Sequence, residues 1–203
     1  NGINEGFAPL SEPSQQIIRD KFSQGKPYFL FVGSQSPRKN VNRLIAAFDL
    51  FKEQTQSDYK LVLVGAVYSS EGDVKRVIDK SKFKNDIIFT GRQPQEELEK
   101  IMASAFALTF VPYFEGFGIP IVEALQCEIP VICSRTTSMP EIAGEAGLLV
   151  NPYEVTSISD GMVELFHNSK LRNQLIEKGK TQKDCFSWDK SADLLWKSIT
   201  KCL

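Results

Sequence analysis

The sequence predicts an α/β fold, a doubly wound parallel sheet of about six strands with helices on both faces. Short apolar runs alternate along the chain with longer segments of helical periodicity, which is the pattern of repeated βαβ units. The runs are apolar throughout rather than at every second residue, as expected of strands covered on both faces. Gly or Pro bounds most of them, which separates each expected strand from the helix that follows.

The expected elements fill the chain, which at 203 residues can bury one good core and is predicted to form a single domain, 1–203. Residues 1–26 are predicted to be a leading segment, a loop followed by a helix over 14–22. The expected strands are 28–32, 60–64, 87–90, 107–111, 130–133 and 147–150. The expected helices are 41–54, 71–82, 95–104, 119–127, 155–168, 170–183 and 188–201.

Composition narrows the classes of function. Lys and Arg number 24 against 25 Asp and Glu, so the basic excess typical of a nucleic-acid partner is missing. No apolar run reaches membrane-spanning length. Cys127, Cys133, Cys185 and Cys202 form no CxxC pair, and we expect them to be reduced thiols in a cytosolic protein. His167 is the single histidine, so no metal site is expected, and we assign it no catalytic role.

In a sheet of this kind, ligands bind beyond the carboxyl ends of the strands. Nearly every unusual group of residues lies in the loops expected at those ends, 33–40, 65–72, 91–94, 112–118 and 134–141. That placement predicts a binding site at this edge of the sheet.

The loop 112–118 carries the strongest signal. Glu115 precedes a turn of small residues, 116–118, and then a helical pattern that begins at Ile119-Pro. A helix N-terminus presents free N–H groups and a positive dipole to a phosphate or a hydroxyl, and glycine lets the ligand approach the backbone. Glu123 lies eight residues after Glu115, so both carboxylates can face one hydroxyl-rich ligand. The alternative is a glycine turn before a surface helix with one exposed glutamate.

The loop 33–40 adds cations. Lys39 and Arg38 lie at a helix start, where positive charge is unfavourable unless an anion is bound. Both side chains suit a diphosphate. Neither the P-loop pattern nor the third glycine of the dinucleotide fingerprint is present. The alternative is a solvated basic turn, with Arg38 in particular pointing to solvent.

These motifs resemble the E-x7-E signature of retaining glycosyltransferases with the GT-B fold, a family that includes many bacterial mannosyl- and glucosyltransferases. Further similar segments follow in the family's order: NGI, YFLFVGSQSPRKNVNRLIAAF, YKLVLVG, IIFTGRQPQEEL, FVPYFEGFGIPIVEAL, PVICSRTTSMPEIAGEAGLLVNP and FSWDKSADLLW. The resemblance covers nearly the whole chain. It implies the carboxyl-terminal, nucleotide-sugar-binding domain, a Rossmann-like half of the GT-B fold, without the amino-terminal domain that usually holds the acceptor.

The resemblance implies donor-binding roles for residues in the first and third loops. Gly33, Ser34 and Lys39 would face the diphosphate, and Ser34 stands where the family most often has arginine. Whether Arg38 replaces that arginine stays open. The resemblance also implies that Arg92 and Gln93 border the nucleobase. The alternative is that they form a plain turn before a helix.

Around the E-x7-E motif, the resemblance implies that Glu115 lies by the donor sugar and that Glu123 accepts hydrogen bonds from the ribose hydroxyls. Ile119 would line the same pocket, with a place in the core as the alternative. The turn residues that would face the sugar or the diphosphate are Gly116, Phe117 and Gly118.

The implied function is transfer of a sugar from a nucleoside-diphosphate sugar to a glycan or lipid-linked acceptor, with retention and without a metal or other cofactor. Lys39 would stabilise the departing diphosphate and Glu115 the developing positive charge, so these are the implied catalytic residues. UDP and GDP both stay open as donor nucleotide, although PRKN and SMPEIAGEAG favour a GDP-mannose enzyme of surface-polysaccharide assembly. This part alone is expected to be inactive. The alternatives are a non-catalytic nucleotide-sugar-binding module and an unrelated doubly wound domain.

The acceptor would bind the missing amino-terminal domain, towards which the terminal helix, 187–203, is expected to pack. Trp188 is expected in the core and Trp196 as an exposed contact for that domain. Glu128 stands where the family has a small residue, and we expect no consequence from it. The implied location is the cytoplasm, and peripheral association with the inner face of the membrane through the other domain stays open.

Overall fold

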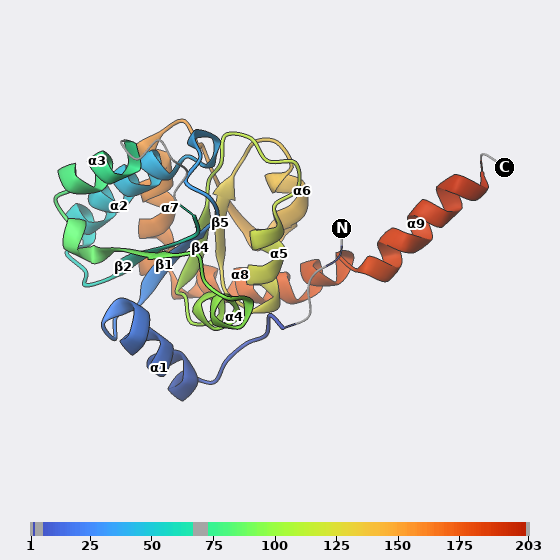
Figure 1. The fold of residues 1–203 in the computed structure, drawn as a ribbon, viewed down its shortest axis with the longest axis horizontal. Coiled ribbons are helices and arrows are strands. Elements are labelled where there is room, and N and C mark those ends of the chain that lie inside the picture. Colours follow the sequence, from blue (N-terminus) through green and yellow to red (C-terminus); the bar gives the residue numbers. More distant parts are fainter. Residues whose placement is uncertain (1, 3–5, 67–72, 202–203) are drawn as a thin grey trace.

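The computed structural model describes residues 2, 6–66 and 73–201 and has the predicted α/β architecture (Figure 1). Within these residues, six parallel strands form one sheet in the order β3-β2-β1-β4-β5-β6. Their bounds are β1 Tyr28–Val32, β2 Lys60–Val64, β3 Ile87–Gly91, β4 Ala107–Phe110, β5 Val131–Ser134 and β6 Gly147–Val150. Each strand lies within one residue of its predicted position. The strand order reverses between β1 and β4, which places the switch point there.

The predicted helices are also present. Their bounds are α1 Glu12–Ser23, α2 Val41–Thr55, α3 Asp73–Lys80, α4 Gln95–Ala103, α5 Ile119–Gln126, α7 Val155–His167, α8 Ser169–Gln182 and α9 Trp188–Thr200. The start of the predicted helix 71–82 lies outside the described residues. A further short helix is α6 Met139–Ala143: the Met139-Pro pair has the pattern of a helix start, but five residues are too few to show helical periodicity. Short 3-10 turns complete the chain, η1 Pro37–Lys39, η2 Lys84–Asp86, η3 Gly144–Ala146 and η4 Lys183–Cys185.

The helices cover the sheet on both faces (Figure 1). On one face α2 packs against α3 and α7, and on the other α5 packs against α4, α6 and α8. This division follows from the strand order, because β1 to β3 wind in one direction and β3 to β6 in the other. The core between the layers is mainly aliphatic, and its largest fully buried side chains are aromatic, namely Tyr28, Phe29, Phe31, Phe48, Phe51 and Phe110.

The backbones of β1 and β2 approach closely where these strands end. The Gly33 N–H donates to the Val64 carbonyl at 2.9 Å, and the Gly65 N–H donates to the Gly91 carbonyl at 3.0 Å. A Cβ on Gly65 would lie 1.9 Å from the Gly33 carbonyl oxygen, and its φ is 144°, so only glycine fits. The loops at this edge therefore begin from a fixed backbone.

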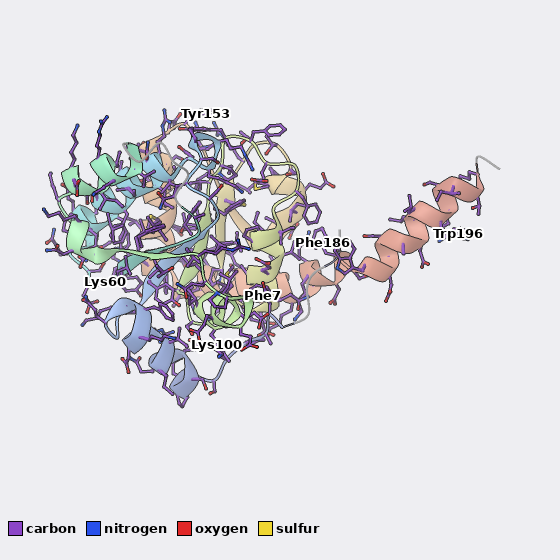
Figure 2. All side chains as sticks on the ribbon, viewed as in Figure 1. Phe7, Lys60, Lys100, Tyr153, Phe186 and Trp196 are labelled. Carbon is purple, nitrogen blue, oxygen red and sulfur yellow. The ribbon has the colours of Figure 1, made fainter. Side chains whose placement is uncertain are left out.

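Helix α9 extends away from the rest of the chain (Figures 1 and 2). None of its residues is buried. The prediction that Trp188 lies in the core is therefore wrong: its side chain is 58% exposed, because the helix leaves the body at this residue. Trp188 lies against Gly2, where an added Cβ would come within 2.4 Å of the ring. Trp196 is exposed as predicted, and its contact with another domain stays a prediction.

In the turn after α5, one non-glycine residue adopts an unfavourable backbone conformation that the sequence does not predict. Glu128 has a φ of 56°, in the left-handed region that favours glycine, and its carboxylate lies 3.6 Å from the Lys180 ammonium. The expectation that Glu128 has no consequence is therefore incomplete.

The described cysteines are free thiols, Cys127 and Cys133 buried and Cys185 exposed, and Cys202 lies outside the described residues. Burial raises the pKa of Cys127 and that of Cys133 to about 12. Across the described ranges, no helix is both long enough and apolar enough to span a bilayer.

Candidate functional site

The loop after β1 and the loop after β4 meet through an ion-pair cluster. The Lys39 Nζ lies 2.5 Å from the Glu115 Oε2, and the Arg38 Nη1 lies 2.7 Å from the same oxygen. The sequence places all three residues at this edge of the sheet, and the structure brings them into direct contact. We call Arg38, Lys39 and Glu115 the donor-edge cluster.

The two cations of this cluster differ in burial. Lys39 is buried, with its ammonium over the Phe110 ring at 4.8 Å from the centroid, whereas the Arg38 side chain is 50% exposed. Glu115 takes one of the three donors of the ammonium, which leaves two for another acceptor. Arg38 also donates to the Phe114 carbonyl at 3.3 Å and keeps further N–H groups. The cluster therefore has donors in reserve and a net positive charge.

Glu115 is ionised in this setting. Burial alone would raise the pKa of the Glu115 carboxyl, but hydrogen bonds from Lys39 and then from Arg38 outweigh burial and hold that pKa below its usual value. A carboxylate that stays charged can both orient the cations and accept a hydrogen bond from a hydroxyl group of a ligand.

The N-terminus of α5 lies next to the cluster, as the sequence predicts. Gly118 precedes the helix with a φ of 113°, and no side chain caps it. A Cβ on Gly118 would lie 2.8 Å from Met139 Cε, so this turn requires glycine. An added Cβ on Gly116 would meet nothing within 4 Å, which leaves that part of the turn open.

Two residues that the sequence analysis does not single out hold these loops in place. The Ser138 hydroxyl lies within hydrogen-bond distance of the Glu115 and Phe117 carbonyl oxygens, at 2.8 and 2.9 Å. The Asn40 side-chain amide donates to the Val111 carbonyl at 2.9 Å and to the Pro152 carbonyl at 2.7 Å. Asn40 has a φ of 62°, and asparagine's tolerance of this conformation is the signal that could have identified it.

Glu123 lies one helical turn into α5 in a very different setting. It is buried, and no hydrogen bond to a donor among the described residues acts on its pKa. Burial, and then the negative charge of Glu99 on α4, raise the pKa of Glu123 to about 7. The two glutamates of the motif therefore differ, since Glu115 is paired with two cations and charged, whereas Glu123 is buried and has no hydrogen-bond donor among the described residues.

The remaining predicted residues line the same edge. Ile119 is 48% exposed, so the alternative that places it in the core is wrong. Phe117 is half-buried and packs edge-on against Phe186, with ring centroids 5.7 Å apart. Arg92 is exposed, and the Gln93 amide donates to the Thr90 carbonyl at 2.7 Å. The residues that begin the first loop are half-buried, namely Gly33 and Ser34.

Arg92 and Gln93 are not brought into contact with the donor-edge cluster. Their strand, β3, lies two strands from β1, which is a separation of roughly 10 Å. Within the described residues, no group of three or more His, Cys, Asp or Glu side chains is arranged to hold a metal ion.

Comparison with known proteins gives a consistent family. The model of the family described as "Glycosyl transferases group 1" matches residues 14–182. The O-antigen chain mannosyltransferase B of Escherichia coli is 33% identical over 162 residues, which are 80% of this chain and 42% of that protein. The serotype-specific mannosyltransferase WbdA of Escherichia coli is 27% identical over 209 residues, 100% of this chain and 25% of that protein. The chain thus spans less than half the length of these relatives.

Solved structures show the same fold. HepE of Anabaena, crystallised with UDP and glucose, superposes with a TM-score of 0.86 at 19% identity and covers 100% of this chain and 56% of its own. The C-terminal domain of the group 1 family protein LpcC from Francisella tularensis superposes with a TM-score of 0.76 at 23% identity. The match covers 90% of this chain and 96% of the LpcC chain. The chain therefore has the fold and nearly the extent of that isolated domain, one half of a GT-B fold.

Proposed function

The chain belongs to the group 1 glycosyltransferases, and we propose that it supplies the donor site of an enzyme that transfers a sugar, with retention and without a metal, from a nucleoside-diphosphate sugar to a glycan or lipid-linked acceptor. The observation that carries this proposal is the donor-edge cluster beside the N-terminus of α5.

The electrostatics of the cluster suit a diphosphate. Arg38 and Lys39 together outweigh the single carboxylate of Glu115, and the dipole of α5 adds partial positive charge from its N-terminus. A departing diphosphate gains negative charge as the bond to the sugar breaks, so these groups stabilise the transition state. Fixed cations supply here the charge that Mg²⁺ supplies in other folds.

The two glutamates of the motif take different roles in this proposal. Glu115, charged and fixed by two cations, accepts a hydrogen bond from a hydroxyl of the donor sugar and stabilises positive charge that develops on the sugar ring. Glu123, buried and without a donor among the described residues, accepts the ribose hydroxyls. Arg92 and Gln93, at the end of β3, border the nucleobase.

We propose GDP-mannose as the donor. The two relatives reported above that are named by activity are an O-antigen chain mannosyltransferase and a serotype-specific mannosyltransferase, which supports mannose. HepE was crystallised with UDP, so the nucleotide has to be measured rather than assumed.

The amino-terminal half of the enzyme is proposed to dock on α9. One side of this exposed helix is apolar and carries Trp188, Leu195 and Ile199 at helical spacing, with Trp196 next to them. The chain spans 42% of the O-antigen mannosyltransferase, so its relatives contain sequence enough for a second domain. The acceptor binds in that other half, and this chain alone is expected to bind donor without turning it over.

Titration of this chain with GDP, UDP, GDP-mannose and UDP-glucose, followed by calorimetry and by melting shift, tests the proposal. Ligand at about a hundred times its dissociation constant stabilises the fold by roughly 2.7 kcal/mol. We expect GDP and GDP-mannose to bind, and Glu123→Gln to weaken both roughly ten- to a hundredfold. Glu128→Gln, which changes a glutamate just after the same helix, is the matched control and keeps wild-type affinity. Failure of all four ligands at millimolar concentration contradicts the donor-site assignment.

A non-catalytic module that uses the same pocket to sense a nucleotide sugar is the second candidate, because the same contacts serve binding and catalysis. Rejoining the chain to the amino-terminal half of its own protein separates the two. Transfer of mannose to an acceptor by the whole enzyme excludes the sensor, and tight donor binding without transfer or hydrolysis supports it.

A further inference from the structure

Two tyrosines and an arginine of α2 are stacked at the carboxyl edge of the sheet. The Tyr113 and Tyr153 rings lie parallel, with centroids 5.3 Å apart and planes 12° from each other. The Arg43 guanidinium lies over the Tyr113 ring at 5.3 Å from its centroid. Tyr153 is 57% exposed and stands at the top of the molecule in Figure 2.

The backbone beneath this stack is fixed to the donor loops. The Tyr113 N–H donates to the Arg38 carbonyl at 2.9 Å. The buried Asn40 side chain joins the Val111 and Pro152 carbonyls, which lie two residues before Tyr113 and one before Tyr153. The Tyr153 N–H in turn donates to the Asn151 side chain at 3.2 Å. An aromatic ring that is exposed and yet held this firmly loses little conformational entropy when a ligand packs on it.

The exposed face of such a ring suits a pyranose. Aromatic faces carry partial negative charge and attract groups with partial positive charge, such as the C–H groups on the apolar face of a sugar. The phenol O–H of tyrosine can in addition donate to a sugar hydroxyl.

The stack is also separate from the place of the nucleoside. The Tyr153 ring lies on Tyr113, which follows β4, and β4 is three strand spacings or roughly 14 Å from β3, the strand that precedes Arg92. Tyr113 is also two residues before Glu115, so a ring on the stack lies beside the donor-sugar end of the site.

We propose that Tyr153, supported by Tyr113, forms a platform for one hexose ring of the acceptor glycan. The choice of a glycan rests on the proposed function, whereas the platform itself rests on the stack. The donor-binding half thus contributes its own contact to an acceptor that is otherwise held by the amino-terminal half.

Saturation-transfer NMR of this chain with α-linked mannotriose, at saturating GDP or UDP, tests the platform. We expect millimolar binding by the wild type and by Tyr153→Trp, which keeps a broad aromatic face, and a loss of about tenfold or more in Tyr153→Ala. Trp196→Ala removes an equally exposed aromatic side chain from α9, far from the stack, and keeps wild-type binding. Nucleotide affinity, measured on the same samples, is expected to be the same in all four proteins.

Equal binding of mannotriose by Tyr153→Ala and wild type overturns the proposal, as does the absence of binding by the wild type at tens of millimolar. Loss of nucleotide binding in Tyr153→Ala also overturns it, because the platform would then belong to the donor site. Failure of the proposed function has a different signature: the wild type binds neither GDP nor UDP, whatever it does with the trisaccharide.

Discussion

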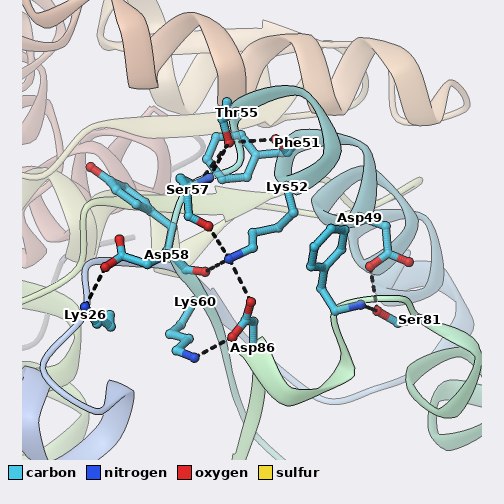
Figure 3. Close-up of polar contacts among 12 residues, drawn as sticks. Lys26, Asp49, Phe51, Lys52, Thr55, Ser57, Asp58, Lys60, Ser81 and Asp86 are labelled. Carbon is cyan, nitrogen blue, oxygen red and sulfur yellow. Dashed lines mark hydrogen bonds and ion pairs between the residues drawn. The ribbon is translucent and has the colours of Figure 1, made fainter.

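Two clusters of equal charge lie at opposite edges of the sheet. The donor-edge cluster joins Lys39 and Arg38 to Glu115 beyond the carboxyl ends of the strands. At the other edge, the Lys52 Nζ lies 2.7 Å from the Asp86 Oδ2 and the Lys60 Nζ lies 2.5 Å from the Asp86 Oδ1 (Figure 3). We call Lys52, Lys60 and Asp86 the far-edge cluster. Each cluster combines two cations with one carboxylate.

The clusters differ in what is left to bind. Lys52 also donates to the Ser57 carbonyl and, at 3.2 Å, to the Tyr59 carbonyl, so its three donors are all used (Figure 3). It lies in the last turn of α2, where the helix dipole favours a cation. Lys39 has two donors in reserve next to a helix N-terminus, which favours an anion. The two clusters therefore differ in how many hydrogen-bond donors are already used, rather than in charge, and only the donor-edge cluster keeps donors with which it could bind an anion.

The largest effect is expected at the far edge. Asp86→Ala leaves two buried lysines without their carboxylate, and should lower the free energy of unfolding by about 3–5 kcal/mol. Denaturant unfolding measures the loss. Asp58→Ala is the control, because it breaks the exposed pair with Lys26 and should cost less than about 1 kcal/mol. Equal losses in the two variants would remove the distinction between the clusters.

The next effect concerns pH and sharpens the comparison. Hydrogen bonds from the paired cations outweigh burial and lower the pKa of Asp86 and that of Glu115, so both carboxylates contribute stability that is lost as the pH falls below their ordinary pKa. The pKa of Glu123 is shifted in the opposite direction, so its effect on stability has the opposite dependence on pH. Its pKa is raised to about 7, so between its ordinary value and that pH the folded protein holds a proton that the unfolded chain releases. Stability should therefore fall as the pH rises through this window.

The change should reach at most about 3 kcal/mol, from 1.36 kcal/mol for each unit of pKa. Unfolding free energies measured from pH 5 to pH 8 should decrease in the wild type and stay nearly level in Glu123→Gln. A slope that persists in the glutamine variant would assign the titration to another group.

The third effect is on binding. Lys39→Met removes the buried ammonium and should weaken the binding of GDP or UDP by roughly ten- to a hundredfold, which is the usual contribution of hydrogen bonds to a charged group. The unfolding free energy should change little, because Arg38 still pairs with Glu115. Calorimetric titration is the measurement, with the exposed Lys100→Met as control. If Lys39→Met instead unfolds like Asp86→Ala and keeps its nucleotide, the donor-edge cluster is structural.

The smallest effect compares the two ends of α5. Positive φ is met by glycine at the donor edge, Gly118, and by glutamate after the last turn, Glu128. Glu128→Gly should raise the free energy of unfolding by up to about 1 kcal/mol, since glycine adopts this conformation without steric cost. Glu128→Ala keeps the strain and loses only the contact with Lys180, so it should not be stabilising. If alanine stabilises as much as glycine, charge rather than backbone conformation explains the effect.

The sheet was predictable because its signals are local. Each buried strand is an unbroken apolar run between turn residues, so the bounds could be read within one residue and the loops of one edge grouped together. The same grouping made Lys39 and Glu115 candidates for the site, and the spacing from Glu115 added Glu123. Helix α6 has a start signal at Met139-Pro but is too short to show helical periodicity, so its extent was not predicted. The position of Trp188 was predicted wrongly because its burial depends on what surrounds its helix, which is exposed to solvent.

Pairings between distant residues could not be read from the sequence. Lys52, Lys60 and Asp86 each look like ordinary surface charges, and only the fold brings them together at the far edge. Likewise, residue types favoured Glu115 and Lys39 as separate ligand contacts, whereas their mutual ion pair depends on the approach of two loops that are 76 residues apart. Pattern predicts which edge binds, and packing decides which groups there are already satisfied.

Helix α9 also affects how the chain tumbles in solution. A compact chain of 203 residues has a radius of gyration of about 17 Å. The 13 residues of α9 add a rod roughly 20 Å long to one side of the body. Rotational friction grows with the longest dimension of a particle, so this helix lengthens the rotational correlation time and the maximum dimension in small-angle scattering beyond those of the body alone.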